Sequence, residues 1–311
     1  MVIETTIILR LTAAFTTMYL VALGHSIFEK SGILNLAIDG VFFLSTGVTT
    51  AVVVPLTWLL TARGLSLVLS TTLAALTAGL ATAIIGIFMA WTLTKLPISH
   101  GAVGLSLMFL GYGLGIIAGY EVRLRVGSIR PYTYPDSLGI YLAILAITVL
   151  IGLLTYFFIF KTALGTAIRA CGENPHVALA LGASVLKTRL IAGLLGFFIM
   201  GVGASFFVLL WQKYWDIKTY LLGYGWLAFT IALAAGRHPI VLIPLAFMFG
   251  GLVEFSITLQ ARLGLQADLA KMLPFIAALI LMIIYGSTKL RRIFEPPGSL
   301  GKVFYKEERT I

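Results

Sequence analysis

The chain of 311 residues is 59% apolar and 11% charged, with a mean hydropathy of +1.03, values that exclude an ordinary soluble globular domain and indicate a protein of the lipid bilayer. Its net charge of +10 does not indicate nucleic-acid binding, because the basic residues lie between apolar runs and in the tail rather than along one helix face. The single cysteine, Cys171, excludes an intramolecular disulfide and a thiol-based metal site.

Apolar runs long enough to cross a bilayer recur along the whole chain. A hydrocarbon core of about 30 Å needs about 20 apolar residues per helix. The first run lacks a basic n-region and a cleavage site, so it is interpreted as a retained span. We predict an all-α, polytopic transmembrane bundle, a single integral membrane domain with about nine segments, at residues 5–24, 33–60, 65–93, 98–119, 138–160, 190–211, 224–235, 240–259 and 272–286.

The loop 161–189 sets the predicted orientation. It carries Lys161, Arg169, Lys187 and Arg189 against one acid, Glu173, and basic loops are retained on the cytoplasmic side. It separates a first half, 5–160, from a second half, 190–288, and the count of spans returns the tail 289–311, with Lys289, Arg291 and Arg292, to the cytosol. The N-terminus and the loop 121–136 then lie outside, although Arg123, Arg125 and Arg130 favour the opposite side for that loop.

The second segment, SGILNLAIDGVFFLSTGV, does not resemble a plain span. Asn35 and Asp39 lie inside an apolar run between Gly32 and Gly40, as expected where a helix is interrupted and faces a protected cavity. The alternative is an ordinary helix that starts at the interface, with both polar side chains making structural hydrogen bonds.

The seventh segment, YLLGYGWLAFTIALAAGRHP, is short and glycine-bracketed, and we predict that it is the partner of the second. Paired interrupted segments in two halves are typical of an inverted repeat around a central pathway. Asn35, Asp39, Tyr224 and Trp226 are the candidate pathway residues, because polar groups beside aromatic faces suit a hydrophilic, ring-bearing solute.

Other glycines and Glu254 are assigned structural roles. Small residues let helix backbones approach closely, so we expect helix contacts at Gly111, Gly115 and Gly119 and at Gly193, Gly196, Gly201 and Gly203. For Glu254, in the eighth segment, a structural or interfacial carboxylate is the favoured interpretation.

The chain has no GxxxxGK[ST] phosphate loop, so it is not itself an ATPase. Its four histidines have no HExxH or other close metal spacing, and no convergent catalytic set is visible, which argues against an intramembrane enzyme. An ion-coupled secondary transporter that uses Asp39 and Glu254 remains an alternative function.

Four stretches together resemble ABC-importer permeases of the branched-chain amino acid and simple-sugar superfamily. The loop LGTAIRACGENPHVALALGASVLKTR resembles the family's RAxGENPxAA-like run, SGILNLAIDG its SGxxNxGxEG, GWLAFTIALAAGRHP its GxxAxAxAxxGxxxP, and LQARLGLQADLAKMLPF its closing region. The resemblance covers residues 28–288 and is nearest to the nucleoside-type permeases. Asp39 stands where the family usually has Glu, Cys171 where Val is common and Phe275 where Tyr is common.

The resemblance implies one subunit of an importer in the plasma membrane. Its partners would be a second permease subunit, expected to be a different homologous chain, cytosolic ABC ATPase subunits that bind the ATP, and an extracytoplasmic solute-binding protein. No cofactor is implied on this chain. The implied solute is a nucleoside or a simple sugar, with a branched-chain amino acid as the alternative.

The resemblance also implies that the loop contains a helix that docks on the ATPase. The matching residues are Gly165, Arg169, Gly172, Glu173, Asn174, Pro175, Ala178 and Leu181. We expect a turn at Gly172, an N-cap at Asn174 and Pro175 in the first turn, with Val177, Leu179 and Leu181 apolar enough to enter a groove. Glu173 would lie near that helix N-terminus. The alternative is an interfacial helix that touches no partner.

Overall fold

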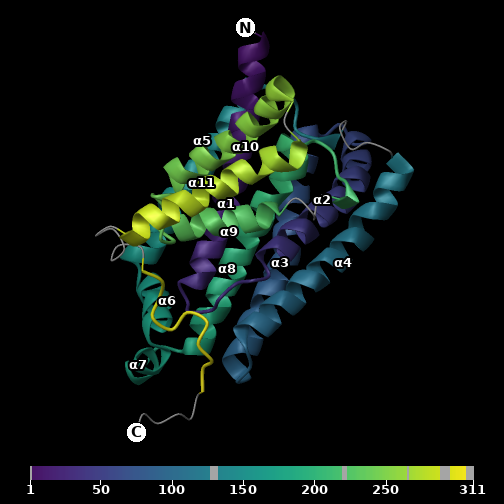
Figure 1. Cartoon of the computed structure of the whole chain (residues 1–311). Coiled ribbons are helices and arrows are strands. Elements are labelled where there is room, and N and C mark those ends of the chain that lie inside the picture. The colour runs from purple at the N-terminus through teal and green to yellow at the C-terminus, as the bar shows by residue number, and fades with distance from the viewer. Residues whose placement is uncertain (1, 127–131, 219–222, 265, 288–294, 306–311) are drawn as a thin grey trace.

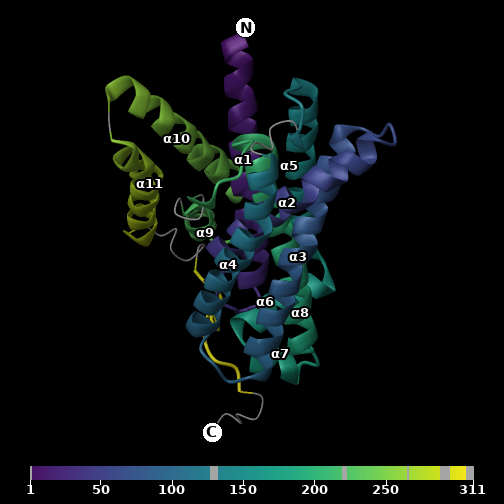
Figure 2. The ribbon, with the colours of Figure 1, turned by 90° about the vertical axis from the view of Figure 1, so that its right-hand side faces the viewer.

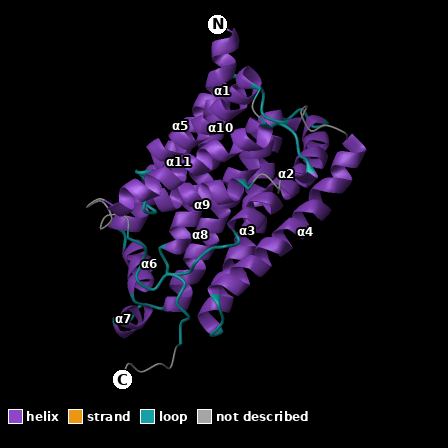
Figure 3. Ribbon diagram, in the orientation of Figure 1, coloured by secondary structure: helices purple, strands orange, loops and turns teal. Residues whose placement is uncertain are grey.

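The computed structural model describes residues 2–126, 132–218, 223–264, 266–287 and 295–305, and within them the ordered elements are all helices (Figures 1 and 3). The helices are α1 (Val2–Glu29), α2 (Ile38–Thr61), α3 (Leu67–Lys95), α4 (His100–Val126), α5 (Leu138–Lys161), α6 (Ala163–Glu173), α7 (Pro175–Ala180), α8 (Val185–Phe206), the π-helical turn η2 (Phe207–Trp211), α9 (Tyr224–Ala234), α10 (Leu242–Leu263) and α11 (Ala267–Ser287).

The prediction of about nine apolar segments is confirmed. Six helices of the described chain are long and apolar enough to cross a membrane, and three shorter apolar helices lie at 224–234, 242–256 and 272–284. The second segment differs in one respect, because its helix begins at Ile38 rather than at residue 33. Residues 31–37 form an irregular stretch between α1 and α2, which we call the α1–α2 break.

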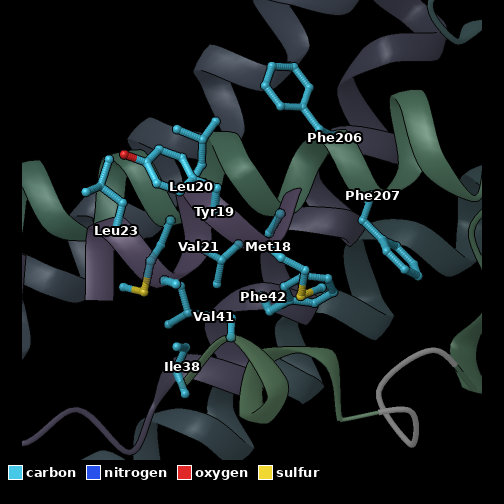
Figure 4. Packing of buried hydrophobic residues seen from close by; sticks show 14 of the residues in the cluster. Met18, Tyr19, Leu20, Val21, Leu23, Ile38, Val41, Phe42, Phe206 and Phe207 are labelled. Atoms are coloured by element: carbon cyan, nitrogen blue, oxygen red, sulfur yellow. The ribbon is translucent and has the colours of Figure 1, made fainter. Parts of the chain in front are cut away.

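Helices α1 and α8 form the centre of the bundle and make extensive contacts with each other, and α3 also packs along α8. In Figure 4, Met18 and Val21 of α1 lie beside Phe42 and Val41 of α2, while Tyr19 and Leu20 point away from them. The Phe42 ring lies 5.4 Å from that of Phe207. The outer faces carry exposed large apolar side chains, such as Phe109 and Ile117 of α4 and Ile84 of α3, as expected for surfaces that meet lipid.

Glycine pairs set the distances between these helices. A Cβ on Gly24 of α1 would lie 2.2 Å from the carbonyl oxygen of Gly196 on α8, and a Cβ on Gly193 would lie 2.5 Å from that of Gly86 on α3. Both distances are far below van der Waals contact, so only glycine allows these backbones to pack so closely.

The predicted packing role of the remaining glycines is also confirmed. Gly111 and Gly115 of α4 lie against the backbone of α2, Gly119 against Trp215, Gly201 against α3 and Gly203 against α1.

Helix interruptions coincide with left-handed backbone. Gly32 in the α1–α2 break has φ +86°, Gly223 directly before α9 has φ +65°, and Gly236 after α9 has φ +58°. Arg237 follows with φ +57°, an uncommon value for a residue with a side chain. The helices of the second and seventh segments are therefore both bounded by non-helical backbone.

The start of α1 and the pair α6–α7 lie at opposite ends of the bundle (Figures 1 and 2). The basic character of loop 121–136, which argued against its predicted side, is partly neutralised: Arg123 forms an ion pair with Asp216, and Arg125 lies 3.6 Å from Glu121. The hydrogen bond from Arg123 holds the pKa of Asp216 below its usual range. Arg130, Lys289, Arg291 and Arg292 lie outside the described residues.

Candidate functional site

Asp39 joins the N-termini of two helices. It lies in the first turn of α2, where its Oδ1 accepts hydrogen bonds from the backbone N–H groups of Gly225 at 2.7 Å and Trp226 at 3.3 Å, both in the first turn of α9. Its Oδ2 accepts a hydrogen bond from the Tyr112 hydroxyl of α4 at 2.5 Å. Since helix N-termini carry partial positive charge, a carboxylate here stabilises both helices.

The contact between α2 and α9 is close. A Cβ on Gly225 would lie 2.4 Å from the Asp39 Cα, so α9 approaches α2 backbone to backbone. The second and seventh segments thus meet, as predicted, and they meet at their N-termini. Asp39 is 3% exposed, and the hydrogen bonds that the alternative interpretation expected for it are present.

Replacing Asp39 with alanine is expected to lower the free energy of unfolding by about 3 kcal/mol, because it removes a helix cap and leaves buried donors without an acceptor. Asp39→Asn keeps an oxygen for the Gly225 N–H and should cost less. Thermal unfolding of the purified protein in detergent checks the order of the two variants. Equal midpoints for them would contradict this account, since the loss would then follow the charge alone.

Asn35 lies in the α1–α2 break at the centre of a second buried group. Its Oδ1 accepts from the Ala37 N–H at 3.1 Å, its Nδ2 lies 3.3 Å from His25 Nδ1, and its own N–H donates to Glu29 Oε1 at 3.3 Å. These contacts hold the break in one conformation, and Asn35 is fully buried.

Glu29, at the end of α1, pairs with Arg237, whose Nε lies 2.5 Å from its Oε2. The side chains are 0% and 5% exposed, and His25 Nε2 lies 3.3 Å from the same oxygen. The ion pair joins the end of α1 to the turn that follows α9. Together with Asp39, it fixes α9 at both of its ends.

Lys30 extends this charged group at the α7 end of the bundle. Burial, together with the nearby cations Arg237 and Arg169, lowers the pKa of the Lys30 ammonium to about 8, while Glu173 opposes the shift. The ammonium lies 5.5 Å from the centre of the Phe160 ring.

The depressed pKa predicts a pH dependence of stability. Between about pH 8 and the ordinary lysine value of 10.5, the unfolded chain binds a proton at Lys30 that the folded chain has lost, so this group makes stability rise with pH. Lys30→Met should remove that contribution. The measurement is the difference between wild-type and variant unfolding midpoints at pH 7.5 and pH 10, and a difference that does not change with pH would contradict the prediction.

Tyr224 and Trp226 begin α9 and are both partly exposed. Tyr224 packs within aromatic-contact distance of Phe42, Phe207 and Trp211, with centroid separations of 6.2, 4.9 and 5.3 Å, and Trp226 packs against Phe229. Two of these rings belong to the π-helical turn η2, a type of interruption that is frequent at functional sites.

Glu254 of α10 lies beside this aromatic group. Its carboxylate accepts from Trp211 Nε1 and forms an ion pair with Arg10 of α1, whose Nε lies 2.7 Å away. The residue therefore ties α1, η2 and α10 together near the end where α1 begins, which agrees with the structural interpretation that the sequence favoured.

The loop 161–189 contains two helices of its own. Asn174 caps α7 by accepting from the N–H groups of His176 at 3.0 Å and Val177 at 3.2 Å, and Pro175 takes the first helical position, both as predicted. Ala178 is buried, whereas Val177, Leu179 and Leu181 are exposed by 53, 40 and 81%.

Two expectations for this loop, those for Gly172 and Arg189, need correction. Gly172 makes no turn; it lies within α6, where a Cβ would approach the Lys30 carbonyl oxygen to 2.1 Å. Gly165 is buried against the end of α5, and Arg169 donates to the Ile159 carbonyl and covers the Phe160 ring. Arg189 belongs to α8 and is fully buried, so it is not part of a solvated basic loop.

Glu173 accepts from the Gly298 N–H at 3.0 Å, a contact with the end of the described chain that the sequence did not indicate.

Comparison with known proteins identifies the family. Residues 7–285 match the family model described as the permease component of the branched-chain amino acid transport system. The chain belongs to this family. The permease is also 27% identical over 276 residues to a putative glucose ABC transporter permease protein, TsgC13, of Haloferax volcanii. The aligned region covers 82% of the permease and 78% of that protein.

Two further relatives match over shorter stretches. The guanosine ABC transporter permease protein NupQ of Bacillus subtilis is 32% identical over 46% of the permease and 44% of its own length. The nucleoside ABC transporter permease protein NupC of Lactococcus lactis is 22% identical over 45% of the permease and 44% of its own length.

Reasoning from the sequence missed the Glu29–Arg237 pair and the Tyr112 partner of Asp39. One signal was available for the pair: each charge directly adjoins one of the two interrupted segments. A charge at the edge of an apolar run needs a partner or water. The opposite charges of Glu29 and Arg237 could therefore have been predicted to form an ion pair.

Proposed function

We propose that the permease is the translocating subunit of an ATP-driven importer in the plasma membrane, that its solute is a nucleoside or a simple sugar, and that the α7 end of the bundle faces the cytosol. The relatives named for glucose, guanosine and nucleosides support this solute class over a branched-chain amino acid. The importer would also contain a second, homologous permease and an extracytoplasmic solute-binding protein.

Exposed apolar side chains on α7 and at its C-cap support the proposal that a separate ATPase drives transport. Leucine and valine side chains exposed at a short helix outside the membrane spans are poorly placed for lipid, and they suit a groove on a partner protein. Within the predicted docking set, Gly165, Arg169, Gly172 and Pro175 support α6 and α7 from inside. Val177, Leu179 and Leu181 supply the contact surface.

The candidate pathway passes the junction of α2 and α9. Asn35 and Asp39 direct their polar atoms into the protein and shape this junction, whereas Tyr224 and Trp226 offer partly exposed rings on which a planar or sugar ring can pack. Closure of the ATPases would move α6 and α7, and the junction would open first to one side of the membrane and then to the other. The donors around Asp39 and Glu254 do not favour an ion-coupled carrier that uses these carboxylates.

Replacing Val177 and Leu181 with aspartate is expected to abolish co-purification of the ATPase subunits and ATP-dependent uptake, because charge would enter an apolar contact at the centre of docking. The matched control is the double variant Ala163→Asp and Leu164→Asp, an equal charge change on two exposed residues in the first turn of α6, where negative charge is favourable. Retention of the ATPases by the variant of Val177 and Leu181 would contradict the docking proposal.

The solute is tested separately. The companion solute-binding protein is titrated with nucleosides, pentoses, hexoses and branched-chain amino acids, and uptake of the tightest ligand is measured in vesicles that hold the whole complex. Uptake by the permease alone under an ion gradient would support the carrier mechanism instead.

A further inference from the structure

Residues 297–305, which we call the strap, run from the far end of the sequence back to the loop that holds α6 and α7 (Figure 1). The Ser299 N–H donates to the Gly172 carbonyl at 2.9 Å, and the Ser299 hydroxyl lies 2.6 Å from the same oxygen and 3.2 Å from the Cys171 carbonyl. Carbonyls in the last turn of a helix have no partner within it. The strap therefore completes the C-terminal end of α6, and the Glu173 carboxylate holds the Gly298 N–H beside it.

The strap also binds the α1–α2 break. The Gly301 N–H donates to the Gly32 carbonyl at 3.2 Å. A Cβ on Gly32 would lie 2.5 Å from the Ser299 Oγ, so the break and the strap are packed without space for a side chain there. Two residues apart, Ser299 and Gly301 thus hold the end of α6 and the break at the same time.

Phe304 forms a second connection, this time to α7. It is 6% exposed and packs in a small cluster with Cys171 of α6, Ala178 of α7 and Val185 of α8. Its ring lies 5.1 Å from the His176 ring of α7.

Arg189 contacts both Phe304 and the α1–α2 break. The Arg189 guanidinium lies 5.4 Å from the Phe304 ring, and its Nε donates to the Ser31 carbonyl at 3.2 Å. Arg189 is fully buried, so the ring and the carbonyl replace part of its lost water. The path from α7 through Phe304 and Arg189 to Ser31 is independent of the path from α6 through Ser299.

We propose that the strap is a fixed mechanical link that passes movement of α6 and α7 to the α1–α2 break, with Ser299 and Phe304 as its positioning residues. The break holds Asn35 and leads into Asp39, so a shift of the break moves the N-terminus of α2 and, through Asp39, that of α9. This role rests on the proposed function, because it needs an ATPase that moves α6 and α7.

The first test uses the whole transporter reconstituted in vesicles, with three readouts: ATPase bound to the permease, ATP hydrolysed and solute taken up. Phe304→Ala should keep the ATPases bound and hydrolysing while uptake per ATP falls at least about fivefold, the lower end of typical coupling between sites. Phe304→Leu, which keeps apolar volume, should restore much of the ratio. The matched control is Tyr305→Ala, since Tyr305 is 46% exposed beside the buried Phe304.

An unchanged ratio of uptake to hydrolysis in Phe304→Ala would contradict the proposed role of the strap as a link. Loss of the bound ATPases in step with uptake would contradict it too. A wild-type permease that binds no ATPase at all is a different result, because it overturns the proposed function itself.

The second test asks whether the strap stays attached during turnover. Cys171 is the only cysteine of the chain and lies fully buried against the strap, and burial raises the pKa of its thiol, so it should react slowly with a maleimide. We expect the permease to remain unlabelled while the wild-type transporter hydrolyses ATP, and Phe304→Ala to be labelled faster. Labelling of the wild type that accelerates with ATP to the rate of Phe304→Ala would show a strap that detaches, and would overturn a fixed link.

Discussion

Gly111→Ala is expected to lower the free energy of unfolding of the permease by about 3 kcal/mol or more, at the upper end of the cost of overpacking a core. The new Cβ would lie 2.4 Å from the Gly40 carbonyl oxygen and 2.5 Å from its carbon, so α4 must move away from α2. The neighbouring backbone cannot rotate aside as a side chain could. The shift would also pull Tyr112 away from Asp39, so uptake should fall with stability.

The control is two residues along the same helix. Gly113 has nothing within 4 Å of its Cβ position, so Gly113→Ala should be neutral or slightly stabilising through better helix propensity. Unfolding midpoints in detergent and uptake in vesicles measure both variants. Similar midpoints for the two would show that α2 and α4 pack less closely than their glycines indicate.

Arg237→Met should destabilise the permease by about 3–5 kcal/mol, because it leaves the buried Glu29 carboxylate without its cation. Glu29→Gln should be costly too, since Glu29 also receives the Asn35 N–H and faces His25. The double variant should cost less than the sum of the single ones, because it removes the unpaired charge. This non-additivity separates an ion pair from two independent packing contacts.

The measurement is the unfolding midpoint of the wild type, the two single variants and the double variant. The control for loss of one positive charge is Lys187→Met, because Lys187 is an exposed cation at the same end of the bundle. Additive single effects would show that Glu29 and Arg237 act separately. We also expect Arg237→Met to reduce uptake more than ATPase binding, since the pair is buried and joins α1 to the turn after α9, whereas the proposed docking side chains are exposed.

The charged and polar contacts form a continuous route through the molecule. From α7 it passes through Phe304 and Arg189 to Ser31, then along the α1–α2 break to Asn35 and Glu29, and from Glu29 to Arg237 after α9. At the other end of α9, Asp39 of α2 accepts a hydrogen bond from the Gly225 N–H, so both ends of α9 are connected to the route. Such a route is a physical connection, and the variants above test whether movement passes along it.

Several features could be predicted because the interactions that produce them are local in sequence. Helix length follows from runs of apolar residues, and the cap at Asn174 with Pro175 needs only the next two N–H groups. Glycines spaced four residues apart on α4 share a face, so their packing role was also predictable, although their partners on α2 were not.

Pairings across long stretches of chain depended on the tertiary structure. A turn was expected at Gly172 because glycine permits one, but the close approach of the Lys30 carbonyl decides its role. Arg189 was counted with the basic loop 161–189, but it is fully buried. Ser299 meets Gly172 across 127 positions, and Arg237 meets Glu29 across 208. The sequence by itself determined which segments enter the membrane, since transfer to lipid depends on composition; which buried charges and carbonyls satisfy one another was decided only when the helices packed.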